Sequence, residues 1–408
     1  MKLLKETFTK NIAFVLALYW IVLVLWQNVS LQTSRGGVDV FLKIILLIYF
    51  IYNFSIRSKG LFSGFPIVLC ITIFFVFSAI NEPSLLSVNI IISYLYPSIL
   101  IFLVYGIGND FEINKKQLIS FCLCVIVTML YAVLYGVIFF PEKITSAILA
   151  TGAYGHEYSS FFISSHEYGM YLVFAIISSV VCLKYSSNLT LTKKLIYISI
   201  IVIFLLNLII TFSRTSILAF VIFISVYLFY ERGQVKRGIV IFFITSLIFI
   251  LSYPTTHSFI FNVILKGNNL AGRDVLFNNA ISYFQSSSYF QFFFGHGITE
   301  PQEYFSNKFG HSSVHNGYLQ VLLFYGISLF SSLLIFLYLQ IKYNYKIIYH
   351  NRFIGSVFLA GNLMSIAIMF SNTTMIFNSS IDSYFLTVFS FIVPKYVSNS
   401  IMNNNFDN

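Results

Sequence analysis

The chain has 408 residues, of which 58% are hydrophobic and only 9% are charged. A soluble domain carries about 25% charged residues, so the composition excludes a soluble protein and indicates an all-α, polytopic membrane protein. The net charge of +10 comes from basic residues dispersed between apolar runs. This dispersion argues against a nucleic-acid-binding surface.

Apolar runs of about 17–25 residues can cross a bilayer as helices, and scanning for them predicts about twelve spans. The predicted spans cover residues 11–27, 38–55, 65–80, 87–106, 117–140, 166–184, 194–211, 213–230, 237–253, 315–341, 353–371 and 377–394. No small-residue cleavage site follows the first run, so we expect an uncleaved first span.

The distribution of basic residues supports this count. With a cytoplasmic N-terminus, seventeen Lys and Arg residues fall in inside segments, six fall outside, and Lys43 lies within a span. We therefore expect one membrane domain over 1–408 with two cytoplasmic termini. We also expect a large periplasmic loop with short helices over 253–314, and a disordered tail over 402–408.

The four cysteines all lie in apolar runs, at Cys70, Cys122, Cys124 and Cys182. One residue separates Cys122 from Cys124, which is too few for the usual pair of metal ligands. We expect these cysteines to act as small apolar side chains, without a disulfide.

Three arginines lie on the predicted outside, where the positive-inside rule disfavours cations. Arg214, in Ser213-Arg214-Thr215, lies between two apolar runs and is either a snorkelling residue or a buried anion-binding group. Arg273 opens a predicted helix, where free backbone N–H groups could join it in an anion site; the alternative is a solvated surface arginine. Arg35 lies in the first outside loop. The apolar stripe predicted for the Arg273 helix is Val275, Leu276, Ala280, Ile281 and Phe284.

Several histidines also lie on the predicted outside of the membrane. Gly295-His296-Gly297 is typical of a turn, and His311 and His315 are spaced i, i+4 before an apolar run. That spacing can bind zinc, but only Glu300 or Glu303 could complete the site, so a neutral imidazole acting as a general base is favoured.

His156-Glu157 and His166-Glu167 recur ten residues apart in the other large outside loop. His166 begins a predicted span, and Glu167 could orient it or bind a sugar hydroxyl. Chance duplication in a short polar loop is the alternative.

These elements together resemble a family. His315-Asn316, nine residues and then Gly326 are similar to the His-Asn-x9-Gly signature of the bacterial O-antigen ligase and polymerase superfamily. Ser213-Arg214-Thr215, Gly272-Arg273-Asp274 and Gly295-His296-Gly297 resemble its other outside elements in the same order. The resemblance covers about residues 195–345 and implies a GT-C-like glycosyltransferase fold.

The resemblance implies a lipid-linked glycosyltransferase of the bacterial inner membrane. It would use undecaprenyl-diphosphate-linked glycans as donor and acceptor at the outer face, without metal or other cofactor. Arg214 and Arg273 would stabilise the diphosphate leaving group, and His315 would deprotonate the acceptor hydroxyl. Asn316 would hold the imidazole or a sugar hydroxyl. The further residues expected to bind substrate are His311, His296, Ser213, His166 and Arg35.

The branches of the family differ in their acceptor. The Phe-, Ile- and Tyr-rich composition and the Ser-Arg-Thr and Gly-Arg-Asp contexts resemble a Wzy-type polymerase of O-antigen or capsule more than a ligase that acts on lipid A-core. A branch that glycosylates protein carries a larger C-terminal outside region. A flippase would be expected to carry charges within several spans, which are nearly absent here. Membrane lipids and a chain-length regulator protein are the other expected partners, with no nucleic acid.

Overall fold

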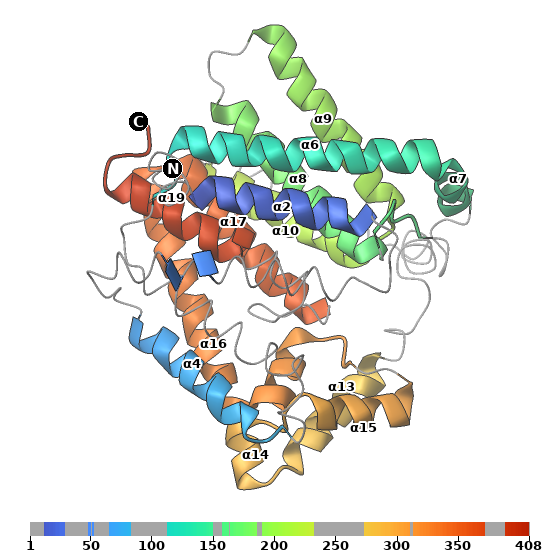
Figure 1. Ribbon diagram of the computed structural model, residues 1–408, viewed down its shortest axis with the longest axis vertical. Helices are drawn as coiled ribbons and strands as arrows, with labels where there is room; N and C mark the ends of the chain where they lie inside the picture. The colour runs from blue at the N-terminus through green and yellow to red at the C-terminus, as the bar shows by residue number, and fades with distance from the viewer. Residues whose placement is uncertain are drawn as a thin grey trace.

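The computed structural model describes residues 12–28, 48–49, 51–52, 65–82, 112–149, 157–162, 164–185, 190–231, 273–310, 313–371 and 388–407. Every regular element within these ranges is helical, which confirms the all-α class (Figure 1). The helices are α2 (Ile12–Asn28), α4 (Phe65–Ala79), α6 (Lys115–Phe139), α7 (Pro141–Leu149), α8 (Ser165–Tyr185), α9 (Leu191–Ile210), α10 (Arg214–Glu231), α13 (Arg273–Gln285), α14 (Tyr289–Phe294), α15 (Thr299–Phe309), α16 (Gly317–His350), α17 (Arg352–Ser371) and α19 (Val393–Met402), the last preceded by a π-helical turn at Val388–Ile392.

Six described helices are long and apolar enough to cross a membrane, namely α6, α8, α9, α10, α16 and α17. The apolar helices α2 and α4 are shorter, and each coincides with a predicted span. The predicted spans at 87–106 and 237–253, and most of 38–55 and 377–394, lie outside the described residues. The chain is therefore a multi-pass membrane protein, whereas twelve spans stay a prediction.

Helices α8 and α10 run parallel. At their N-terminal ends, the Nδ1 atom of His166 lies 2.9 Å from the hydroxyl oxygen of Ser213, the residue before α10. At their C-terminal ends, Lys184 forms a 3.2 Å ion pair with Glu231. The two helices therefore start at one end of the bundle and finish at the other.

Helix α17 packs antiparallel to α10 along most of its length. The Nε atom of Arg352, at the start of α17, donates to the carbonyl of Tyr230 near the end of α10, at 2.7 Å. The C-terminal turns of α17 consequently lie beside the N-terminus of α10. This end of the bundle is the one that the charge distribution assigns to the outside.

Disorder over 402–408 stays a prediction, and the described residues of this tail contact the chain around the start of α6. The side chain of Asn403 donates to Glu112 at 2.7 Å, and Lys115 pairs with Asp407 at 3.3 Å. The ring of Phe406 is buried, and its carbonyl accepts from the backbone of Lys115. One aromatic anchor and several hydrogen bonds thus hold residues up to Asp407 against the start of α6.

Three helices, α13 to α15, fall within the predicted loop over 253–314. The buried face of α13 is rotated from the predicted stripe: Leu276 and Ala280 are buried, whereas Val275 and Ile281 are exposed. The reason is that Tyr283, which the prediction omitted, packs between α13 and α15 and turns that flank of α13 inward.

Candidate functional site

Helix α16 is interrupted at Gly326, where the backbone takes φ 74° and ψ −178°. The sequence predicted one continuous span over 315–341. The rings of Tyr318 and Phe330 lie 6.4 Å apart, whereas twelve residues of continuous helix would separate them by about 18 Å along the axis. The segment 317–325 therefore folds back beside the rest of α16, as a half-helix.

The interruption frees carbonyl groups that would otherwise accept hydrogen bonds within the helix. The backbone N–H groups of His296 and Gly297 donate to the carbonyls of Leu323 and Phe324, at 2.8 and 3.2 Å. Because a buried carbonyl without a hydrogen bond is costly, this turn from the preceding loop stabilises the break.

Two glycines make this close approach possible. A Cβ atom on Gly326 would lie 2.4 Å from the carbonyl oxygen of Phe293, and one on Gly295 would lie 2.2 Å from that of Phe324. Both glycines also have positive φ, 84° at Gly295 and 74° at Gly326. The glycine of the His-Asn-x9-Gly pattern thus has a structural reason: only glycine permits both this conformation and this contact.

The end of α4 contacts the same turn and the break in α16. The sequence does not predict this contact. Glu82 is only 3% exposed, and its carboxylate accepts from the backbone N–H groups of Ile298 and Thr299 at 2.7 and 3.1 Å. The hydroxyl of Thr299 also donates to it. A carboxylate at the N-terminus of α15 is favoured by the helix dipole. An acidic residue directly after an apolar run was the only sequence signal for this contact.

Two further side chains of α4 and its following turn complete the contact. The hydroxyl of Ser78 donates to the carbonyl of Tyr325 at 3.3 Å, and the amide of Asn81 donates to the carbonyl of Gly295. We call Ser78, Asn81 and Glu82 the α4 clamp. It joins three segments that are far apart in the sequence: the end of α4, the 295–299 turn and the break in α16.

His296 is buried within this region. Its Nε2 lies 2.6 Å from the hydroxyl of Ser287, and its Nδ1 lies 3.3 Å from a carboxylate oxygen of Glu300. The ring of Tyr283 lies tilted against the imidazole, with the ring centres 4.7 Å apart, and its hydroxyl donates to the same carboxylate at 2.6 Å. Burial lowers the pKa of His296, and the neighbouring carboxylate of Glu300 opposes this shift. Both ring nitrogens thus have partners inside the protein, and a substrate contact for His296 stays a prediction.

His315 and Asn316 lie at the N-terminus of the half-helix. The side-chain oxygen of Asn316 caps it by accepting from the N–H groups of Tyr318 and Leu319, both at 3.0 Å. His315 is partly buried and has a positive φ of 53°. The hydroxyl of Tyr318 donates to the carbonyl of Ile366 on α17 at 3.0 Å, which holds this N-terminus against the C-terminal part of α17.

A second cluster lies where α8 and α10 begin. The buried hydroxyl of Ser213 contacts His166, lies 2.8 Å from the hydroxyl of Ser216 and accepts from the N–H of Ser216 at 3.3 Å. Ser213 therefore caps α10. The structure brings together two residues, His166 and Ser213, that the sequence placed on separate outside segments.

Arg214 is the first residue of α10 and is partly buried. It precedes Tyr230 by sixteen residues, and the same number of residues from Arg352 along the antiparallel α17 leads to Ile368. Tyr318 is bound to Ile366, one half-turn away. The N-terminus of α10 and the half-helix that begins with His315-Asn316 therefore lie at the same level of α17.

The remaining predicted residues are described less fully. Arg273 is the first residue of α13, which packs against α16, but its side chain lies outside the described part of the structure. His311 and Arg35 also lie outside the described residues. Within those ranges, no group of three His, Cys, Asp or Glu side chains could hold a metal ion.

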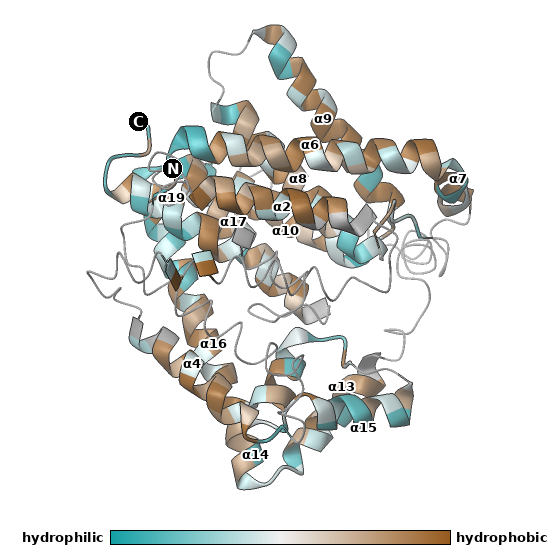
Figure 2. Ribbon diagram, viewed as in Figure 1, coloured by the Kyte–Doolittle hydropathy of each residue, from teal (hydrophilic) through white to brown (hydrophobic). Residues whose placement is uncertain are grey.

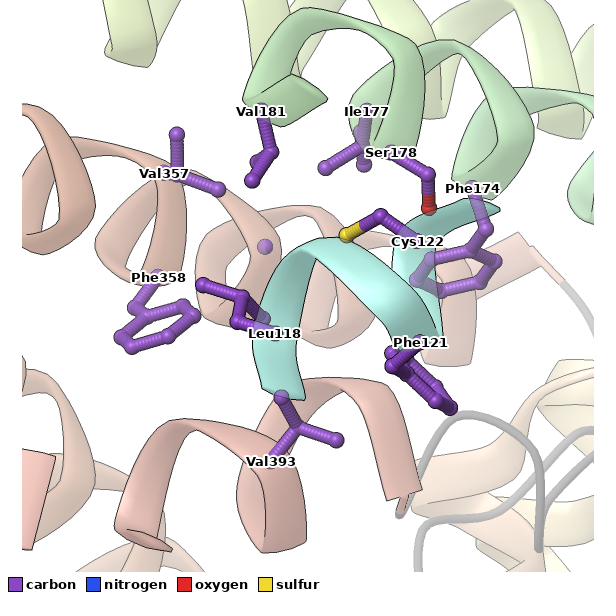
Figure 3. A pocket seen from close by; sticks show the side chains of 11 residues that line it. Leu118, Phe121, Cys122, Phe174, Ile177, Ser178, Val181, Val357, Phe358 and Val393 are labelled. Atoms are coloured by element: carbon purple, nitrogen blue, oxygen red, sulfur yellow. The ribbon is translucent and has the colours of Figure 1, made fainter. Parts of the chain in front are cut away.

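A cavity of about 40 Å³ lies among α6, α8, α17 and α19 (Figure 3). Its lining is almost entirely apolar and includes Leu118, Phe121, Phe174 and Val357. A cavity of about 10–15 Å³ holds one water, so this space has room for a few waters and is too small for a sugar. None of the predicted site residues lines it.

Residues 199–334 match the family model described as O-antigen ligase. Over this segment the chain is similar to the O-antigen ligase/polymerase superfamily. Its members are membrane enzymes that transfer glycosyl groups and act on lipid-linked glycans. The match covers about one third of the chain and contains Arg214, α13 to α15, His315-Asn316 and Gly326. A search of curated proteins found no significant match.

Proposed function

We propose that this chain polymerises undecaprenyl-diphosphate-linked oligosaccharide units into a surface polysaccharide at the outer face of the inner membrane. The observation that carries the proposal is that two helix N-termini lie at the same level of α17. One begins with Arg214, and the other begins after His315-Asn316. Helix N-termini attract anions, and an interrupted helix at membrane depth is a common way to build an anion site.

The proposed reaction transfers a glycan between two lipid-linked molecules. The hydroxyl oxygen of the acceptor sugar bonds to the anomeric carbon of the donor glycan, and the bond from that carbon to the diphosphate oxygen breaks. Undecaprenyl diphosphate leaves with the bonding electron pair, and the hydroxyl proton passes to the imidazole of His315. No oxidant, reductant or metal is needed for this balance.

The arginines act on the leaving group in this proposal. A guanidinium group binds phosphate oxygens through paired N–H donors and stays charged at every physiological pH. Arg214 and Arg273 would stabilise the negative charge that develops on the diphosphate. His166, Ser213 and Arg35 would contact the sugars or the diphosphate. Asn316 would orient the site through its cap of the half-helix.

A ligase that transfers the finished glycan to lipid A-core is the second candidate. The matching family model is described as O-antigen ligase, and the match is equally compatible with both candidates. Both reactions use the same donor chemistry and differ only in the acceptor. The polymerase is preferred for the Ser-Arg-Thr and Gly-Arg-Asp contexts around Arg214 and Arg273.

Deleting the gene and separating the surface glycans on a gel tests the proposal. A polymerase deletion should leave lipid A-core with a single repeat unit. Bare core together with polymer retained on the carrier lipid would instead identify a ligase. Absence of lipid-linked units from the outer leaflet would identify a flippase and contradict both glycosyltransferase candidates.

A further inference from the structure

Helix α14 presents an aromatic surface that the rest of the described chain does not cover. Tyr289 is 90% exposed, and Phe290, Phe292 and Phe293 are 42%, 38% and 48% exposed. We call these four residues the α14 aromatic patch. Exposed phenylalanines grouped on one short helix mark an interaction surface.

The α14 aromatic patch and the next helix, α15, differ in their content of charged residues. No charged residue occurs between Asp274 and Glu300, whereas α15 carries Glu300, Glu303 and Lys308. Figure 2 shows the same contrast, since α15 is largely hydrophilic and α4, beside α14, is hydrophobic. The uncharged segment suits a lipid environment, and α15 suits water.

The position of α14 along α16 sets its depth. From Gly326 to Lys346 there are 20 residues, which span about 30 Å of helix and match the thickness of the hydrocarbon core. Lys342 and Lys346 are the charged residues of α16 and mark one membrane surface. Gly326 then lies at the opposite boundary, and α14 is docked there through Gly295.

The patch also continues an exposed apolar face of α4. Ring contacts join the two helices, since Phe294 stacks on Phe77 at 5.3 Å. The exposed apolar residues of α4 recur on one helical face, at Leu69, Ile73, Val76 and Phe77, and Ile80 in the turn after α4 continues this face next to the contact. An apolar helix of a multi-pass protein faces lipid with such a stripe, so the patch lies in line with a lipid-facing surface.

We propose that the α14 aromatic patch inserts into the membrane leaflet on the side where α8 and α10 begin, and anchors the 273–310 loop to the bilayer. The patch contacts lipid, because three observations point to the same environment. The patch lies at the expected membrane boundary, its segment carries no charged residue, and it continues the exposed apolar face of α4. This inference does not depend on the glycosyltransferase proposal. It adds a lipid contact that would fix the 295–299 turn, and with it the half-helix, at the level of lipid headgroups.

Tryptophan fluorescence in reconstituted bilayers tests the anchor. A Tyr289→Trp variant of the full chain is placed in phosphatidylcholine vesicles with and without brominated acyl chains, and iodide serves as the water-soluble quencher. The matched control is Asn307→Trp on the exposed face of α15. The signal of the parent chain, from its two native tryptophans, is subtracted.

The Tyr289→Trp signal should be quenched at least about threefold more by brominated lipid than the Asn307→Trp signal, and should resist iodide. Equal quenching of both variants by iodide, with no effect of brominated lipid on Tyr289→Trp, would overturn the proposal. Protection of Tyr289→Trp from both quenchers would also overturn it, since a protein partner or second copy would then cover the patch.

Discussion

The candidate site has two halves, which hold their polar groups in different ways. The first half is the start of α8 and α10, and the second half is the break in α16 with the segments that contact it. Helices α8 and α10 run uninterrupted and parallel, and His166, Ser213 and Ser216 bond to one another where they begin. Helix α16 is instead broken, and its freed carbonyls are satisfied by a turn and by the α4 clamp. The first half depends on contacts between neighbouring helices. The second half forms only when three distant segments assemble, so it should be the more sensitive to substitution.

Replacing Gly326 with alanine should have the largest effect. The added Cβ meets backbone of the 293–295 segment, and alanine strongly disfavours φ 74°. Strain and overpacking together should cost about 2–6 kcal/mol, enough to reduce polymer formation by ~100-fold or more. Glycan chain length in a complemented deletion strain measures the effect.

The matched control is Gly361→Ala on α17, where an added Cβ meets nothing within 4 Å. This control should retain normal polymer formation. If Gly326→Ala also retained it, the break in α16 would not matter for function, and the comparison between the two halves would fail.

Arg214→Lys should have the next largest effect. Lysine keeps the charge but lacks the planar pair of donors that fits a phosphate, so activity should fall by about 10- to 100-fold. Arg273→Lys should behave similarly. Arg352→Lys is the control, because Arg352 lies at the opposite end of α10 and bonds a backbone carbonyl there. Normal chain lengths in both the Arg214 and Arg273 variants would remove the assignment of a diphosphate site.

Glu82→Gln should loosen the second half without changing the first. The amide keeps the size of the carboxylate and one oxygen for the N–H groups of Ile298 and Thr299, but it loses the negative charge at the N-terminus of α15. Its NH2 group also replaces the oxygen that accepts from the Thr299 hydroxyl, so the change should cost about 1–3 kcal/mol. Hydrogen exchange should rise in the 295–309 region and stay constant at the start of α10. Glu142→Gln, on the exposed α7, should change neither. Faster exchange in α10 as well would mean that the two halves fold as one unit.

Acid should produce the smallest effect, again only in the second half. The pKa of His296 is lowered in the folded protein, so His296 binds a proton more readily when the 295–299 turn is detached from α16. The attachment of this turn to α16 should therefore weaken as the pH falls below about 6.5. Limited proteolysis of the 283–304 segment measures this. The pH response should disappear in His296→Gln and persist in His350→Gln, a change at the exposed end of α16.

Much of the first half was predictable from the sequence. Long apolar runs predicted α8, α9 and α10 within a few residues, because lipid requires helices of that length. The same rule marked Arg214 as unusual, since it stands on the side where cations are disfavoured. The direct contact of His166 with Ser213 was not predictable, because it depends on the parallel register of α8 and α10.

The second half could be predicted only in fragments. The motif identified Gly326 and the Gly295-His296-Gly297 turn, but hydropathy treats α16 as one span, since a single glycine barely changes an apolar average. Glu82 lies 216 residues from Ile298, its hydrogen-bond partner, and no local pattern links the two. The rotation of α13 likewise depends on Tyr283, whose burial is decided by α15 and not by the sequence of α13.

The most direct test of the central claim is glycosyl transfer by the purified protein in bilayers with undecaprenyl-diphosphate-linked repeat units. The wild-type chain should join two units and release one undecaprenyl diphosphate for each bond formed. His315→Asn is the decisive variant, because asparagine tolerates the positive φ of residue 315 but cannot act as the base. It should reduce the transfer rate by about 10²- to 10⁴-fold. Transfer at the wild-type rate by this variant, or none by the wild-type chain, would contradict the account.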